Sequence, residues 1–182
     1  MNMLWRVLWV RLTAALRPRL GLWDTAVTPF RVHATDLDVY AHMNNGRYLS
    51  ILDLGRLDLM VRSGLWQRLK QAGWYPVVAG QTITYRRSLE LGQRYDVHTA
   101  VVGFDDRWCY LEQQFRVDDA VHAHAVIRAR FLRRGGGTVD TAELARLAGE
   151  IPDHLEVPSW VAEWTRWTRV PNTRNSHING DE

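Results

Sequence analysis

The hydrophobic period of this chain changes between residues 27 and 132, and this change most limits the folds open to it. In 107–117 and again in 121–132, apolar residues alternate with polar ones. A period of two is typical of strands that have one packed face and one solvated face. Similar patterns predict strands at 27–34, 76–86 and 93–103, whereas the spacing of apolar residues predicts helices at 45–63 and 65–72.

The order of these elements indicates the α+β class. One long helix follows the first strand, and a meander of four antiparallel strands then covers it. No glycine-rich phosphate loop is present, which argues against a nucleotide-binding enzyme. With 182 residues, 46% of them apolar, the chain suits one domain, predicted at 24–170, with a loose polar tail at 171–182.

The first 23 residues are predicted to form a separate amphipathic helix. They contain four arginines, three tryptophans and no acidic residue, and they are too short and too charged to span a bilayer. On a helix, one face carries Leu4, Trp5, Leu8, Trp9, Leu12 and Leu16, and the opposite face carries Arg6, Thr13 and Arg17. Two interpretations stay open: a helix at a membrane surface, and a helix packed on the domain or on a second subunit.

Near the other end, a short helix is predicted after Pro158. Trp160, Trp164 and Trp167 recur in it at helical spacing, and we expect them to anchor this helix on the domain.

The composition limits which metals and macromolecules we expect this chain to bind. Cys109 is the single cysteine and no Cys/His cluster has zinc-ligand spacing, so we expect neither a disulfide nor a metal site; His122 and His124 are two potential ligands without a third. A cytoplasmic location is expected, and if the first helix binds a membrane surface, that surface is the inner face of a membrane. The net charge of +3 is small and the arginines are scattered, so nucleic-acid binding is not expected.

The segment 35–48 holds the densest group of reactive side chains, and it lies just before the long helix. Asp36, Asp38, His42, Asn44 and Asn45 fall within ten residues. The first backbone N–H groups of a helix have no intrahelical partner and attract negative charge, so a carbonyl oxygen that becomes an oxyanion suits this place. A carboxylate here could attack a carbonyl or take a proton from water. A simpler interpretation is that Asn44 caps the helix and Asp36 holds the loop.

The same segment carries a family resemblance. The pattern D-x-D-x-x-x-H-x-N-N-x-x-Y, which ends at Tyr48, resembles the signature of hot-dog-fold thioesterases related to 4-hydroxybenzoyl-CoA thioesterase. The nearer match is to the branch of thioesterase superfamily member six and its bacterial relatives, through HMNNGRYL, TYRRSLEL and GFDDRWCYLEQQF, and it covers about 28–168. The resemblance implies a central helix wrapped by an antiparallel sheet, with the active site where two subunits meet.

Site residues follow from this resemblance. Asp38 is similar to the acid that serves the 4-hydroxybenzoyl-CoA enzymes as nucleophile or base, and His42 to a histidine of plant acyl-carrier-protein thioesterases. Tyr40 stands where those plant enzymes have an asparagine. Asn45 and Tyr48 complete the signature, as further catalytic and substrate-binding candidates.

Three further charged residues are candidates for the site. Arg86 and Arg87 adjoin a strand end, and arginine forks suit the phosphates of coenzyme A. Asp53, on the long helix, is a second candidate carboxylate, although it can also pair with Arg56 three residues on.

The predicted function is hydrolysis of an acyl-CoA or acyl-carrier-protein thioester to free acid and thiol, which needs no cofactor, by a homodimer or homotetramer. Two alternatives stay open. One is a non-catalytic acyl-binding or membrane-associated hot-dog protein, and the other is a hot-dog dehydratase or hydratase.

Overall fold

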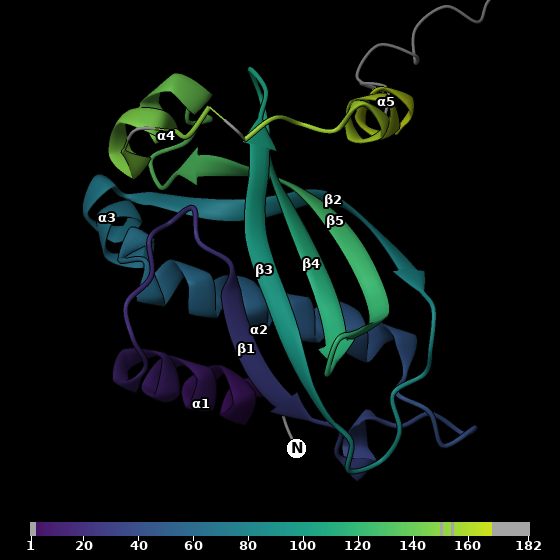
Figure 1. Cartoon of the computed structure of the whole chain (residues 1–182). Helices are drawn as coiled ribbons and strands as arrows, with labels where there is room; N and C mark the ends of the chain where they lie inside the picture. Colours follow the sequence, from purple (N-terminus) through teal and green to yellow (C-terminus); the bar gives the residue numbers. More distant parts are fainter. Residues whose placement is uncertain (1–2, 150, 154, 169–182) are drawn as a thin grey trace, which may run out of the picture.

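A five-stranded antiparallel sheet and one long helix form the centre of the molecule (Figure 1). The computed structural model describes residues 3–149, 151–153 and 155–168. The strands are β1 (Ala26–Arg31), β2 (Trp74–Tyr85), β3 (Arg94–Phe104), β4 (Cys109–Val117) and β5 (Ala120–Arg133). The helices are α1 (Met3–Leu16), α2 (Asn45–Arg62), α3 (Leu65–Ala72), α4 (Thr141–Ala148) and α5 (Ser159–Trp167), with a single 3-10 turn, η1 (Ala34–Asp36).

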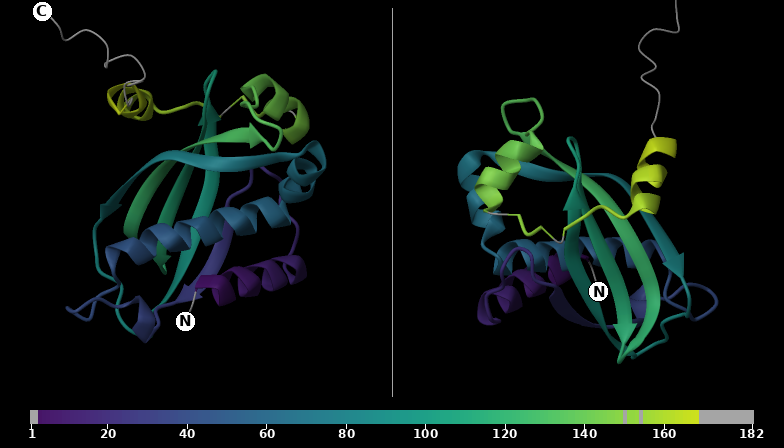
Figure 2. Two further views of the ribbon diagram at one scale, coloured as in Figure 1. Left: turned by 180° about the vertical axis from the view of Figure 1, so that it is seen from behind. Right: turned by 45° about the horizontal axis from the view of Figure 1, so that its top comes forward.

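Helix α2 lies across one face of the sheet, and the core fills the space between them (Figures 1 and 2). Gly55 brings the helix close to the sheet, because a Cβ atom there would lie 2.8 Å from the hydroxyl oxygen of Thr99 and 3.0 Å from the amide nitrogen of Gln113. The predicted α+β class is therefore observed. The long helix and the strands predicted from alternating residues lie near their predicted bounds.

The predicted meander of four strands is wrong in one respect. The strand order is β1-β3-β4-β5-β2, so only β3, β4 and β5 form a meander. Strand β2 crosses to the far edge and pairs with β5, and β3 pairs with β1. Sequence alternation identifies strands but not their neighbours, since pairing depends on which edges remain open after the helix has packed. The crossing leaves β2 as an edge strand.

Helix α5 covers part of the opposite face of the sheet (Figure 2). Its Val161 is buried and its Trp164 is partly buried against Tyr110 and Val126. The expectation that three tryptophans anchor this helix holds only for Trp164, because the side chains of the other two, Trp160 and Trp167, are exposed. The predicted tail at 171–182 lies outside the described residues.

Helix α1 runs beside α2 (Figure 1). The residues that it buries are Arg6, Val10 and Ala14, so the side with Arg6 faces inward. Arg6 is buried and forms an ion pair with Asp36, and Arg17 forms one with the fully buried Asp58. Asp58 also accepts hydrogen bonds from Thr28 Oγ1 at 2.9 Å and from Arg62 at 3.2 Å. A helix is thus present within residues 1–23 and packs on the domain, but it ends at Leu16, well before residue 23. Among the described residues, no helix combines the length and the hydropathy that a membrane span requires.

Removal of the Asp58 carboxylate should destabilise the fold. We expect Asp58→Ala to lower the free energy of unfolding by about 3 kcal/mol, because it leaves Arg17 and Arg62 without their buried partner. Urea unfolding followed by circular dichroism measures this. Asp119→Ala, at an exposed hairpin turn, is the matched control, and an equal loss in both variants would contradict the assigned role.

Candidate active site

The segment around Asp38 folds into a small hairpin that projects from the start of α2. Leu37 pairs with Met43 as an isolated bridge, and the backbone N–H of Asp38 donates to the carbonyl oxygen of His42 at 2.8 Å. The turn needs a positive φ of 61° at Ala41. At the tip, Val39 and Tyr40 are 93% and 78% exposed, which is unusual for large side chains of this kind.

The carboxylate of Asp38 is held by one of its two oxygens. Oδ1 accepts hydrogen bonds from the backbone N–H groups of Tyr40 at 2.9 Å and of His42 at 3.3 Å. Oδ2 makes no hydrogen bond within the described residues. One oxygen therefore fixes the group while the other stays open to a substrate or a water molecule.

Asp36 lies directly before the hairpin and fixes its first residues to the domain. It is fully buried, forms an ion pair with Arg6, lies 3.7 Å from Arg47 Nε, and accepts a hydrogen bond from the backbone N–H of His33 at 2.9 Å. Its carbonyl oxygen also accepts from the N–H of Asn44 at 2.8 Å. The interpretation of Asp36 as a loop anchor is confirmed, and its cationic partners are contacts that the sequence did not reveal.

Asn44 and Asn45 have different contacts at the start of α2. The side chain of Asn44 accepts from the N–H of Gly46 at 2.8 Å, so its predicted capping role is confirmed. The backbone N–H and the side-chain amide of Asn45 make no hydrogen bond with any described residue. These donors lie at the positive end of the helix dipole and are available to a negatively charged oxygen.

His42 is exposed at the base of the hairpin. Its backbone forms an isolated bridge with Glu90, while the next residue, Met43, donates its N–H to the carbonyl oxygen of Leu89 at 3.0 Å. The hairpin is thereby tied to the segment that follows β2. Asp38 and His42 thus lie on this hairpin and Asn45 lies at the start of the helix that follows it, and their joint role in catalysis stays a prediction.

Tyr48 lies in the core behind this region. Its hydroxyl accepts a hydrogen bond from the N–H of Leu89 at 3.2 Å, and its ring packs edge-on against Tyr85 and Phe115. Burial raises the pKa of this hydroxyl, which therefore stays neutral at physiological pH. The observed contacts make Tyr48 a support for the segment after β2, and its part in substrate binding stays a prediction.

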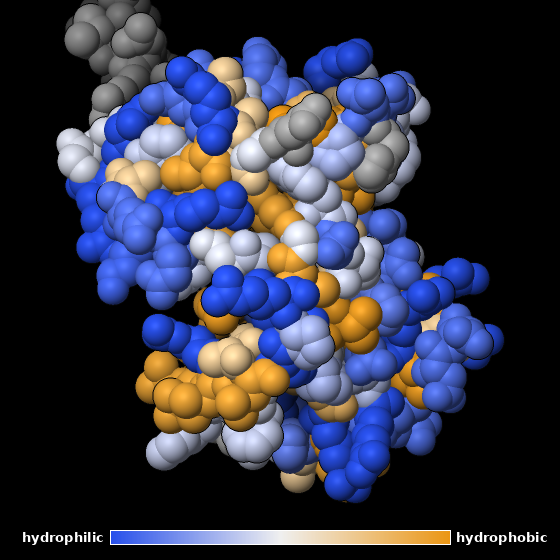
Figure 3. All heavy atoms as spheres, turned by 60° about the vertical axis from the view of Figure 1, so that its left-hand side comes forward, coloured by the Kyte–Doolittle hydropathy of each residue, from blue (hydrophilic) through white to orange (hydrophobic). Residues whose placement is uncertain are grey.

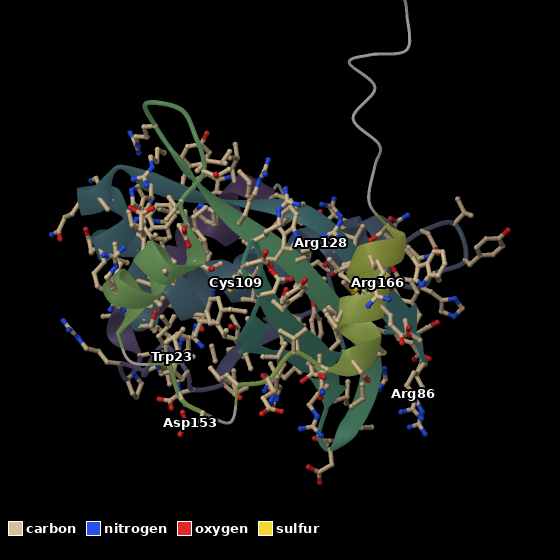
Figure 4. The ribbon with its side chains drawn as sticks, turned by 90° about the horizontal axis from the view of Figure 1, so that it is seen from above. Trp23, Arg86, Cys109, Arg128, Asp153 and Arg166 are labelled. Atoms are coloured by element: carbon tan, nitrogen blue, oxygen red, sulfur yellow. The ribbon has the colours of Figure 1, made fainter. Side chains whose placement is uncertain are left out.

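Arg86 and Arg87 lie just beyond β2 with exposed side chains. Their backbone N–H groups both donate to the carbonyl oxygen of His122, at 2.8 and 3.1 Å. With Ala120 and Val121 they line a shallow surface pocket of about 310 Å³. Figure 4 shows Arg86 extending outward at the periphery of the molecule, so a large anionic group can reach it without entering the core.

An apolar pocket of about 160 Å³ opens further along α2. It lies between α2 and the sheet, and its lining residues include Met60, Pro76, Val78, Cys109 and Phe131. Asp53 also lines this pocket and lies eight residues after Asn45 on α2. That separation is about 12 Å along a helix axis, so within one chain the pocket lies well away from Asp38.

A polar network borders this pocket. Arg56 pairs with Asp53 and donates to Gln113 Oε1 at 2.6 Å, and the Gln113 amide nitrogen donates to Thr99 Oγ1 at 2.8 Å. Burial lowers the pKa of Arg56, and the carboxylate of Asp53 opposes this effect. Sequence reasoning missed Gln113, although an amide at an inward position of an alternating strand is a visible signal.

The histidines on β5 have structural partners. His124 Nε2 lies 2.6 Å from a carboxylate oxygen of Glu112, and His122 Nδ1 lies 3.2 Å from the carbonyl oxygen of Ser88. Among the described residues, no group of three or more His, Cys, Asp or Glu side chains is placed to hold a metal ion.

Known proteins share both the sequence and the fold of this chain. The profile of the Thioesterase-like superfamily matches residues 32–165. The chain belongs to this superfamily. Protein THEM6 of Xenopus laevis is 35% identical to it over 148 residues, which cover 80% of this chain and 68% of that protein. Protein THEM6 of Danio rerio is 35% identical over 131 residues, 70% of this chain and 65% of that protein, so this chain spans about two thirds of the length of these relatives.

The structural comparison agrees with the superfamily. The crystal structure of the probable thioesterase YbaW from Escherichia coli has a TM-score of 0.63 and 25% identity, and the match covers 67% of this chain and 95% of that chain. The predicted hot-dog fold and thioesterase family are confirmed, and the superfamily supports a thioester hydrolase.

Cys109 should be unreactive although it lines the apolar pocket. Burial raises the pKa of its thiol to about 12 from an ordinary 9.0, which leaves about a thousandfold less thiolate at pH 8. We expect a disulfide reagent such as dithionitrobenzoate to react slowly with the native protein and fast with the urea-unfolded protein. Rapid stoichiometric labelling of the native protein would show that this thiol is open to attack.

Proposed function

We propose that this protein hydrolyses acyl-CoA thioesters with Asp38 as the reacting carboxylate. The observation that supports this most is that one carboxylate oxygen of Asp38 is held by two backbone N–H groups while the other has no partner among the described residues, and that Asn45, seven residues on, begins α2 with unpaired donors. A thioester needs both a nucleophile at its carbonyl carbon and donors at its carbonyl oxygen. The segment 38–45 carries both kinds of group.

Two routes fit this arrangement. In one, Asp38 Oδ2 adds to the thioester carbon, the C–S bond breaks, and water then hydrolyses the acyl anhydride to free acid and Asp38. In the other, Asp38 takes a proton from a water molecule whose oxygen adds to the carbon, and the C–S bond breaks as the tetrahedral intermediate collapses. In both routes the Asn45 donors stabilise the oxyanion, and His42 delivers a proton to the departing thiolate.

The acyl group would occupy the apolar pocket of a second subunit. Strand β2 has an open outer edge, and its end at Tyr85 lies near the start of α2, where the Tyr85 hydroxyl donates to the carbonyl oxygen of Asn45 at 3.4 Å. Its first half, Pro76 to Val78, lines the apolar pocket. Antiparallel pairing of two β2 edges would place the Asp38 region of each subunit beside the pocket of the other. It would also cover apolar side chains that one subunit leaves exposed.

The size of the pocket indicates a class of acyl group. A cavity of about 150 Å³ lined by aliphatic and aromatic side chains holds one benzene molecule. The pocket of about 160 Å³ in one subunit is of that size. A short acyl chain or a single aromatic ring is therefore the proposed acyl group, and Arg86 with Arg87 would bind phosphates of coenzyme A.

Asp38→Asn should abolish thiol release from acyl-CoA esters. The amide keeps an acceptor for the N–H groups of Tyr40 and His42 but is neither nucleophile nor base, so we expect kcat to fall at least about a hundredfold. The assay follows free thiol over a panel that runs from acetyl-CoA through benzoyl-CoA to palmitoyl-CoA.

Two carboxylates serve as matched controls. Asp119→Asn should leave kcat unchanged, and Asp53→Asn should alter KM more than kcat because Asp53 borders the acyl pocket. A large loss of kcat in Asp53→Asn with little loss in Asp38→Asn would show that the reacting carboxylate is Asp53 on α2 and not Asp38. Binding without turnover in the wild type would favour an acyl-binding protein, and a change in enoyl absorbance without thiol release would favour a hydratase.

Replacement of the two arginines after β2 should weaken binding of coenzyme A selectively. We expect Arg86→Gln with Arg87→Gln to raise KM for an acyl-CoA about tenfold, because each arginine loses a charge-assisted contact with phosphate. The same acyl group on N-acetylcysteamine has no phosphate, so its KM should not change. An equal effect on both substrates would contradict the assignment.

A further inference from the structure

Helix α1 presents its apolar face to solvent. Trp5 and Trp9 are each 65% exposed, and Leu8, Leu12 and Leu16 are between 47% and 87% exposed. These residues, with Leu4, form what is here called the α1 face. Figure 3 shows hydrophobic surface at the lower left, at the level of this helix. Apolar patches of this kind mark interaction sites on soluble domains more often than unused surface.

The orientation of the α1 face is imposed by buried charge. Arg6, Val10 and Ala14 are buried on the inner side of the helix, and Arg6 and Arg17 pair with Asp36 and Asp58. Rotation of the helix to hide its leucines would expose these residues and would take from two fully buried carboxylates the arginine partners that this segment supplies. These ion pairs therefore hold the helix with its apolar side toward solvent.

A groove continues the α1 face toward the sheet. It has a volume of about 660 Å³ and lies between α1 and β1. Trp5, Trp9 and Phe30 contribute apolar walls, and Arg31 and Arg94 lie at the same groove with exposed side chains. An apolar channel bordered by arginines suits a molecule with an acyl chain and an anionic head.

The charges around the α1 face favour an anionic partner. Residues 1–23 contain no acid, and Asp36 and Asp58, which contact the helix, are both fully buried and paired. Arg11, Arg31 and Arg94 remain exposed around the face. A second copy of the chain is a poor occupant, because a two-fold contact would join two copies of the same patch, and neither helix α1 nor the groove lining offers an exposed carboxylate to pair with these arginines.

We propose that the α1 face and its groove dock this protein on the surface of a bilayer that contains anionic phospholipids. Trp5, Trp9 and the leucines enter the boundary between head groups and acyl chains, where tryptophan is favoured. Arg31 and Arg94 bind lipid phosphates, and an acyl chain lies along the groove. This contact is independent of thioester hydrolysis.

Co-sedimentation with vesicles tests this proposal in the full chain. Wild type is mixed with vesicles of phosphatidylcholine alone and of phosphatidylcholine with phosphatidylglycerol. Trp5→Gln with Trp9→Gln removes the two tryptophans of the α1 face. Trp160→Gln with Trp167→Gln is the matched control, because it removes two exposed tryptophans of α5. Deletion of α1 is avoided, since it would remove Arg6, the partner of Asp36, and would uncover the side of the domain on which α1 packs.

We expect wild type and the α5 variant to sediment with anionic vesicles, and the α1 variant to lose at least about tenfold in partitioning. Arg31→Ala with Arg94→Ala should weaken binding to anionic vesicles about fivefold per arginine, and Arg107→Ala with Arg166→Ala should not. The proposal is overturned if wild type does not sediment with anionic vesicles or if both tryptophan variants behave alike. It is also overturned if light scattering without lipid shows an oligomer that only the α1 variant loses.

Discussion

The buried carboxylate of Asp36 is the contact on which the rest of this structure depends. It joins three segments that are far apart in sequence: Arg6 on α1, Arg47 on α2, and its own turn before the Asp38 hairpin. A fully buried ion is tolerated only where cations and backbone donors surround it. Asp36 therefore determines at once where α1 docks and how the reactive hairpin leaves the domain.

A second consequence concerns the sidedness of α1. Amphipathic helices usually bury their apolar stripe, because burial of apolar area is the main gain in folding. Here two arginine–aspartate pairs determine the orientation, and the apolar stripe faces outward. The same interaction that stabilises the hairpin thus creates a surface suited to a lipid partner. The proposed hydrolytic site and the proposed membrane contact would then both depend on the buried carboxylate of Asp36.

The proposed reacting groups and the apolar pocket are separated along α2. Asp38 and Asn45 lie at its start, whereas the pocket lies next to Asp53 and the first half of β2. The open edge of β2 offers a way for two chains to bring these parts together. In the proposed dimer, this separation is the reason for a second subunit, because the start of α2 in one subunit would lie beside the apolar pocket of the other.

The sequence by itself determined the elements and the reactive segment. Alternation in 107–117 and 121–132 predicted β4 and β5, and Gly64 marked the end of α2. Asp38, His42 and Asn45 became candidates because they are neighbours along the chain. Such features depend on local periodicity and on helix termini, which a sequence displays directly.

Only the tertiary structure decided the contacts between distant segments. The crossing of β2 to the far edge, the pairing of Arg6 with Asp36, and the contact of Gln113 with Arg56 each join residues at least 30 positions apart. Amphipathicity showed that α1 has two faces but not which one docks. That choice depends on two carboxylates, in η1 and in α2, whose burial arises only when the whole domain has packed.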